Sequence, residues 1–297
     1  MKGSTALSSL IALLIIISRV TGQTNDRLVT VAVLDLGSST IARLANDKLR
    51  QSLAAHREFS VSDSELTAAA ARGTGYSGSL NLSLSEARDL GAVLAADFYL
   101  LGDAQTLRRS SSTNDKYFES YCTIFLISSR TGRLIHWERP SFRAETDKTA
   151  EAQLLNRLSQ EDVYHTLAVS IRRAQEDERN ERALIIDSQE PVITEAPDDD
   201  QQAQAEGLRL PKPYRRLRPE YPDTAATADA EATVDALVDV GADGEVSQVR
   251  IARWAGFGLD EATLTTVRQL HFFPAMKNGT AVPMRVLLRY NFRKSAK

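Results

Sequence analysis

The loop Asp35-Leu36-Gly37-Ser38-Ser39-Thr40 is the first stretch whose residue types could do chemistry, because it joins an apolar run to a helical pattern. Backbone N–H groups of such a loop can bind a phosphate at the positive end of a helix. Glycine and serine also simply make the turn and cap the helix. No second phosphate loop and no adenosine site accompany this loop, and a lone motif of this kind is weak. We therefore predict a structural turn, no ATP chemistry and no cofactor.

Metal and thiol chemistry has no visible basis in the sequence. The four histidines are His56, His136, His165 and His271, with no pair at i,i+4 and no cysteine or carboxylate at ligand spacing. Cys122 is the single cysteine, so the chain can form no internal disulfide or thiolate cluster. Because it lies in the apolar run 121–127, we interpret it as a small buried hydrophobe. We predict no metal site, no catalytic residue and no enzymatic activity.

Length and composition limit the organisation of the chain. With 297 residues, two folded units joined by a linker are expected. The hydrophobic share of 42% and the charged share of 25% are those of a globular protein. A net charge of -3 creates no field that would attract nucleic acid, so we expect no nucleic-acid partner.

The amino terminus has the pattern of an export signal. Lys2 supplies a positive start, Leu10 to Ile17 is an unbroken apolar run, and Val20-Thr21-Gly22 offers small residues for cleavage. We predict a signal peptide at 1–22 and a periplasmic mature protein. The alternative is an uncleaved inner-membrane anchor, although the run is shorter than the roughly 20 residues of a membrane-spanning helix. No cysteine lies near the cleavage position, which excludes acylation as a lipoprotein.

Residues 27–182 alternate between strand and helix patterns, which is typical of an α/β domain. The run Val29–Leu34 predicts a central strand, and the spacing of Ile41, Ala45 and Leu49 predicts a helix packed on the sheet. Further elements are strands at 59–62 and 97–102, a helix from Ser83, a hairpin of 117–128 with 134–137, and one long helix over 151–182. We expect an α/β sandwich.

Three motifs in this domain carry a family resemblance. They are Val31-Ala32-Val33-Leu34-Asp35-Leu36, the stretch Ala95 to Gly102, and Arg130-Thr131-Gly132-Arg133-Leu134. In this order, over about 28–175, they resemble the α/β domain of the curli secretion lipoprotein family, to which the TolB amino-terminal domain is similar. The resemblance implies a role in envelope assembly, as a pore subunit or a docking module. The acylated cysteine of the curli protein is missing from this chain.

The stretch 183–212 changes composition twice. Acidic residues between Asp187 and Glu206 sit among prolines and glutamines, which predicts a solvated linker. The charge of the chain then changes from negative to positive in a basic run that ends at Pro219. This run is either a soluble leader into the next domain or a surface for an acidic partner or anionic lipid.

Residues 213–297 predict a small β-β-α-β domain. An alternating strand at 233–240, the turn 242–245 and a second strand at 246–254 precede a helix that carries Leu259, Thr263, Val267 and Leu270 on one face. A long strand to Phe292 then closes the domain. The overall fold class is therefore α/β plus α+β.

Five motifs of this domain occur in a characteristic order: Tyr221-Pro222, Asp243-Gly244, Leu259-Asp260, Arg268, and Phe272-Phe273-Pro274-Ala275. Together they resemble the carboxy-terminal domain of TonB. The resemblance implies that an extended peptide of an outer-membrane TonB-dependent receptor, or of another envelope protein, adds to the edge of the last strand. The partner-binding residues that it implies are Arg218, Pro219, Glu220, Tyr221, Arg285, Val286, Leu287, Leu288, Arg289 and Asn291.

Two alternatives stay open for this edge. Arg285 and Arg289 either recognise the partner or protect an exposed edge by their charge. Proline at Val286 is expected to remove an edge N–H and so weaken peptide binding.

The sequence thus predicts a periplasmic TonB-like protein that acts in energy-dependent transport or envelope assembly. The alternative is a structural assembly or oligomerisation protein in which the TonB-like domain is a docking part. Homo-oligomerisation, and membrane association through the amino-terminal segment, stay open.

Overall fold

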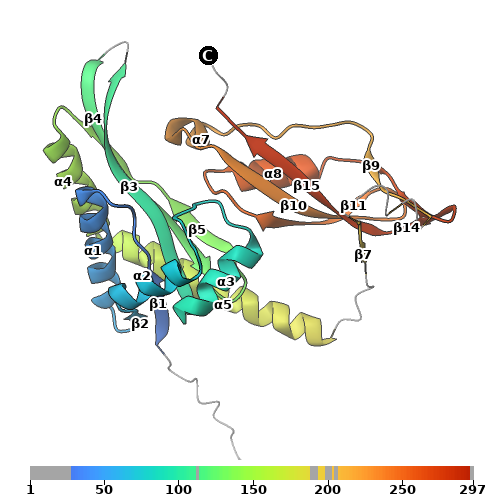
Figure 1. Ribbon diagram of the computed structural model, residues 1–297, viewed down its shortest axis with the longest axis horizontal. Coiled ribbons are helices and arrows are strands. Elements are labelled where there is room, and N and C mark those ends of the chain that lie inside the picture. Colours follow the sequence, from blue (N-terminus) through green and yellow to red (C-terminus); the bar gives the residue numbers. More distant parts are fainter. Residues whose placement is uncertain (1–27, 112–113, 188–192, 198–202, 204–206, 295–297) are drawn as a thin grey trace, which may run out of the picture.

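The computed structural model of the protein describes residues 28–111, 114–187, 193–197, 203 and 207–294. The signal peptide or anchor predicted at 1–22 lies outside these residues. Within them, no helix has the length and apolar character needed to cross a membrane. The predicted fold class is confirmed: a mixed α/β domain is followed by a smaller domain with a sheet and one main helix (Figure 1).

The amino-terminal domain is built on one mixed sheet. Its strands are β1 (Val29–Val33), β2 (Phe59–Val61), β3 (Phe98–Ser111), β4 (Asn114–Ser128), β5 (Leu134–Glu138) and β6 (Ser141–Ala144). The order is β2-β1-β3-β4-β5, with β6 also paired to β4. The strand β1 is parallel to β2 and β3, and the remaining pairs are antiparallel. The central strands are apolar on both faces because both faces are covered.

Helices cover the two faces of this sheet (Figure 1). On one face, α1 (Thr40–Ala54), α4 (Asp147–Leu158) and α5 (Glu161–Asp187) pack around Leu100, Ile124 and Leu126. On the other face, α2 (Ser64–Gly73) and α3 (Leu84–Leu94) pack around Leu101 and Phe125. Cys122 is fully buried, as predicted, and burial raises the pKa of its thiol.

The prediction of a single helix over 151–182 is wrong, because the chain forms two helices, α4 and α5, with a break between them. Ser159 ends α4, and its hydroxyl donates to the carbonyl oxygen of Leu155 instead of continuing the helix. The helix α2 was not predicted. Its signal is Asp63, whose carboxylate accepts from the N–H groups of Glu65 and Leu66 at the helix start.

The loop after β1 has the predicted structural role. Gly37 adopts a φ of 114°, which favours glycine, and Ser39 caps α1 by accepting from the N–H of Ala42. The Ser39 hydroxyl also donates to the carbonyl oxygen of Ala104 on β3. These contacts give the glycine and the serine of the loop a structural role.

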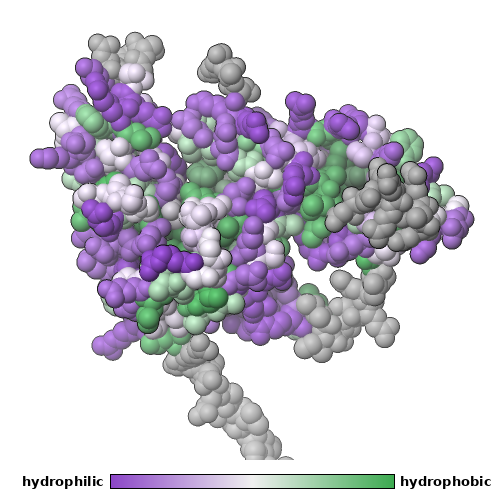
Figure 2. Space-filling view, in the orientation of Figure 1, coloured by the Kyte–Doolittle hydropathy of each residue, from purple (hydrophilic) through white to green (hydrophobic). Residues whose placement is uncertain are grey.

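The carboxy-terminal domain has the predicted β-β-α-β order, formed by β10 (Ala232–Val240), β11 (Val246–Arg253), α8 (Leu259–Val267) and β15 (Met284–Phe292). Before it, α7 (Asp223–Ala228) is a short helix, and β12 (Phe272–Phe273), β13 (Ala275–Lys277) and β14 (Thr280–Val282) precede β15. The main sheet has the order β11-β10-β15-β7. Helix α8 covers one face, where Val238, Val267 and Phe272 are buried. Figure 2 shows an apolar area over this domain amid a mostly hydrophilic surface.

Of the stretch 183–212 predicted as a solvated linker, residues 183–187 form the end of α5, and the described residues from 193 on are attached to the carboxy-terminal domain. β7 (Thr194–Glu195) pairs with β15, β8 (Leu208–Arg209) with β13, and β9 (Lys212–Pro213) with β12. Apolar side chains explain the attachment, since Ala203 and Leu208 are buried against Met284. The composition of the stretch hides these few apolar residues among many charges.

Candidate functional site

The outer edge of β15 is occupied at one end and open at the other. β10 lies along one side of β15, and β7 pairs in parallel with its start at Met284 and Arg285. The N–H of Ala196 donates to the carbonyl oxygen of Arg285 at 2.8 Å. From Leu287 to Phe292, no strand in the described part of the chain lies on the outer side. This open edge is the site that the sequence indicates.

The direction of the Arg285 carbonyl shows which backbone groups point outward. The β10–β15 register runs from Ala232 to Val240 without a shift, so N–H and C=O groups alternate between the two sides of β15. Those of Arg285, Leu287, Arg289 and Asn291 therefore point away from β10. We predicted that Val286→Pro would remove an N–H from the open edge. This prediction is wrong, because the Val286 N–H faces β10, and its removal would disrupt the pairing of β15 with β10.

Both predicted recognition arginines are held by carboxylates of the neighbouring strand. Arg285 donates to both oxygens of Asp239 at 2.5 and 2.8 Å, and Arg289 donates to both oxygens of Asp235 at 2.7 and 3.0 Å. Both aspartates are buried. Hydrogen bonding to Asp235 raises the pKa of Arg289. These fork-shaped pairs fix the arginines on the sheet face opposite α8, with the exposed Leu287 between them.

The remaining predicted partner-binding residues lie on two sides of β15. Val286 and Leu288 face α8 and contact its hydrophobic cluster, together with Leu217. Tyr221 lies near Phe292, at a ring distance of 6.5 Å, and its hydroxyl donates to the carbonyl oxygen of Ala230. Arg218 and Glu220 are exposed and Pro219 is half-buried. The stretch 217–221 thus follows β15 on its helix side, while the arginines occupy the other side.

A contact between the two domains was missed by the sequence analysis. Trp254 follows β11, yet its side chain is buried in the core of the amino-terminal domain and is 2% exposed. Its indole N–H donates to the carbonyl oxygen of Gly132 at 2.9 Å. Its ring meets Phe125 edge-on at 5.6 Å, and Phe257 meets Phe125 and Trp137. The loop 254–257 therefore anchors one domain in the other.

Polar contacts fix this anchor from both ends. The Asn81 side chain donates to the carbonyl oxygens of Thr233 and Trp254 and accepts from the Thr233 N–H. Arg253 donates to the Asn81 carbonyl and pairs with Glu86 at 3.0 Å. The sequence gives one signal for this loop, an aromatic residue on each side of a glycine.

Asp260 at the start of α8 holds the anchor loop from within the carboxy-terminal domain. Its two carboxylate oxygens accept from the N–H groups of Ala255 and Gly256, each at 2.9 Å. Burial raises the pKa of Asp260 to about 7, although both hydrogen bonds act in the opposite direction. The Leu-Asp motif of the sequence therefore has a structural role at the domain contact.

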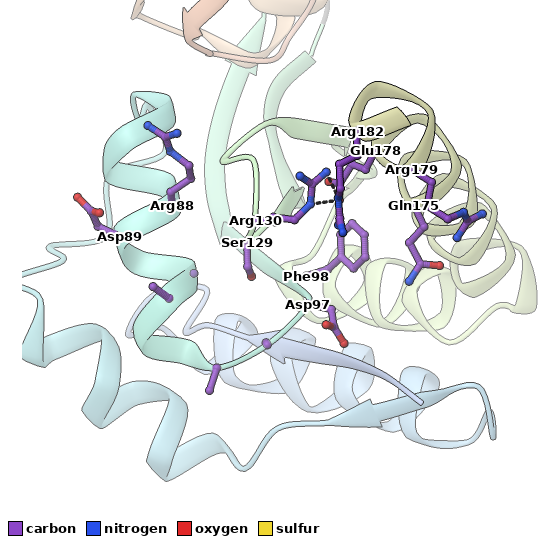
Figure 3. Close-up of a pocket in the computed structure, with 14 residues that line it drawn as sticks. Arg88, Asp89, Asp97, Phe98, Ser129, Arg130, Gln175, Glu178, Arg179 and Arg182 are labelled. Carbon is purple, nitrogen blue, oxygen red and sulfur yellow. Dashed lines mark hydrogen bonds and ion pairs between the residues drawn. The ribbon is translucent and has the colours of Figure 1, made fainter. Parts of the chain in front are cut away.

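The turn that receives Trp254 is fixed on its other side by α5. Figure 3 shows Arg130 pointing to Glu178, which it contacts at 2.6 Å. The buried Glu178 carboxylate also accepts from the Ser128 hydroxyl at 2.6 Å. Across the pocket in this view, Arg88 projects from α3. The turn 129–133, which accepts the Trp254 indole N–H, is thus held in place by hydrogen bonds to α5.

The fold defines a class of small domain in which three antiparallel strands, β11, β10 and β15, are covered on one face by one helix. Residues 218–293 match the family model of the Gram-negative bacterial TonB protein C-terminal. This match covers the carboxy-terminal domain and leaves the amino-terminal domain outside it. The predicted TonB resemblance is confirmed for these residues.

Solved structures give weak likenesses to the chain. The TonB carboxy-terminal domain of Pseudomonas aeruginosa is 20% identical, covers 29% of this chain and 89% of its own, with a TM-score of 0.26. The hypothetical protein CT253 of Chlamydia trachomatis is 14% identical, covers 48% and 98%, with a TM-score of 0.35. The PelC dodecamer of Paraburkholderia phytofirmans is 14% identical, covers 44% and 85%, with a TM-score of 0.27.

No curated protein matches the chain. The curli and TolB resemblance of the amino-terminal domain stays a prediction.

Proposed function

We propose that the protein acts in the periplasm and binds an extended peptide of an outer-membrane TonB-dependent receptor, or of another envelope protein, as an added strand on β15. The open edge from Leu287 to Phe292 is the observation that carries this proposal. Outward N–H and C=O groups of Leu287, Arg289 and Asn291 supply the hydrogen bonds. The family match over 218–293 supports the choice of partner.

The position of β7 supports strand addition as the binding mode. This segment already pairs in parallel with the start of the same edge, and its Ala196 N–H bonds to β15. A partner peptide that follows β7 along the edge would meet Leu287 and then Arg289. Both arginines are paired to buried aspartates, so they orient the edge and contribute little free charge. Affinity then comes mainly from backbone pairing and from contact with Leu287.

The test uses peptides from receptor plug domains of the host and the full chain. Leu287→Pro removes an outward N–H, so we expect it to weaken binding about 2- to 10-fold relative to Leu287→Ala, the worth of one hydrogen bond. Leu287→Ala keeps that N–H and is the matched control. Fluorescence anisotropy gives the affinity and circular dichroism checks the fold. If no plug peptide binds the native chain, the transport proposal fails.

A second candidate is an assembly protein in which the TonB-like domain is a docking part and the amino-terminal domain is a curli-like envelope module. The burial of Trp254 supports this candidate, because the TonB-like domain contacts the folded surface of the amino-terminal domain in the same chain. Light scattering of the full chain separates the two. A stable oligomer favours assembly, and a monomer favours peptide capture.

A further inference from the structure

A groove lies between the two domains, along the outer edge of β11. It has a volume of about 720 Å³ and is lined by β5 on one side and by β11 and α8 on the other. Apolar residues on both walls include Leu134, Trp137, Ile251 and Leu264. Grooves between domains with apolar walls and a few polar groups are common binding sites.

The edge of β11 in this groove is partly free. β10 pairs with one side of β11. On the other side, Ser83 of the amino-terminal domain bridges Arg253, and His271 bridges Glu245 just before the strand. Between them, the described residues give Ser247 to Ile251 no partner strand. At about 3.3 Å per residue, this opening is about 16 Å long. The chain itself therefore uses this edge for strand pairing at Arg253 and leaves the next residues open.

The two faces of the open edge differ in character. Val249 and Ile251 pair with Val238 and Ala236, so they share the apolar face that α8 covers. Arg250 pairs with Leu237 on the opposite face. A strand added here would place alternate side chains against an apolar surface and against an arginine.

Arginines outnumber carboxylates in the lining of the groove. Its lining contains the arginines Arg88, Arg130, Arg133, Arg250, Arg268 and Arg285, against the carboxylates Asp260 and Glu261. Arg130, Arg133 and Arg285 are held by carboxylates. Arg250 and Arg268 are exposed, and no ion pair reaches either of them from the residues that the structure describes. Their charges are therefore available to a partner.

We propose that this groove binds an extended segment of a partner protein in which acidic and apolar residues alternate, as an added strand on β11. The apolar residues face Ile251 and Leu264, and the acidic residues face Arg250. The strand β11 forms the edge of the sheet opposite to the one at β15. The proposal for β11 therefore does not depend on the function proposed for β15.

The test uses the full chain and a fluorescent decapeptide of alternating valine and glutamate. We expect binding that slows amide hydrogen exchange at 247–251 and leaves 287–292 unchanged. Arg250→Glu should weaken binding about tenfold or more, because it places like charges together. Arg173→Glu changes an exposed arginine of α5 and is the matched control. A peptide with lysine in place of glutamate should prefer the Arg250→Glu variant.

Three results would overturn the proposal. One is the absence of binding at millimolar peptide. Another is equal weakening by Arg250→Glu and Arg173→Glu. The third is protection at 287–292 instead of 247–251, which would assign the peptide to β15. Because Arg250 is exposed, Arg250→Ala serves as a second variant if Arg250→Glu does not fold, and it should weaken binding less than the charge reversal does.

Discussion

The indole N–H of Trp254 donates to the carbonyl oxygen of Gly132, a residue of the other domain, at 2.9 Å. The glycine is required there, since a Cβ at Gly132 would lie 2.2 Å from the carbonyl oxygen of Leu84. One hydrogen bond and one buried ring thus join segments that are far apart in the chain.

Trp254→Ala should separate the two domains. Loss of this buried ring removes about 3–5 kcal/mol of packing, most of it at the domain contact. We expect the native chain to unfold in one transition and the variant in two. Trp254→Phe keeps most of the ring volume but loses the N–H, so its effect should be smaller. A Trp254→Ala variant that still unfolds in one transition would contradict this role.

Arg285→Ala should destabilise the protein more than Arg289→Ala does. Asp239 loses both its hydrogen bonds when Arg285 is removed, whereas Asp235 retains Arg253 at 3.5 Å. An unpaired buried carboxylate costs about 3–5 kcal/mol, and urea denaturation measures it. The double variant Asp239→Ala/Arg285→Ala should regain part of the loss. Equal effects of the two arginine variants would count against this ranking.

Asp260 should make stability depend on pH. Its pKa is raised from 3.8 to about 7 by burial. The native state therefore holds a proton between about pH 4 and 7 that the unfolded chain has released, so stability falls as pH rises through this window and then levels off. Asp260→Asn should flatten this slope in denaturation series from pH 4 to 8. Glu231→Gln, at an exposed position, should leave it unchanged.

Ala196→Pro should open the start of the β15 edge. It removes the N–H that donates to Arg285, so β7 pairs less well. If receptor peptides bind this edge, their affinity should rise about 2- to 10-fold, the worth of one hydrogen bond. Ala196→Ser keeps the N–H and provides the comparison. Unchanged affinity in the proline variant would mean that β7 does not compete with the peptide.

Local patterns predicted most of the elements. The alternation at 233–240 and the apolar run at 29–34 gave strands within a residue or two, and Ser83 with Glu86 forms the capping box that starts α3. The break at Ser159 was missed because neither glycine nor proline marks it. These successes and failures depend on residues close together in the chain.

The site was harder to predict because it depends on distant partners. Arg285 and Arg289 lie four residues apart, as do Asp235 and Asp239, but their pairing follows only from the β10–β15 register. Trp254 reads as the end of a strand, since Gly132 and Phe125 lie more than a hundred positions earlier in the sequence. The strands β7 and β8 were not predicted, because they lie in a stretch whose composition is dominated by charged residues.

The anchor loop has a practical consequence for anyone who studies the TonB-like domain by itself. A fragment of 213–297 would carry Trp254 and Phe257 without the surface of Phe125 and Trp137 that covers them. Two bare aromatic rings next to an open sheet edge favour self-association. Dimers of such a fragment would then result from the removal of the amino-terminal domain, and would say nothing about how the intact protein assembles.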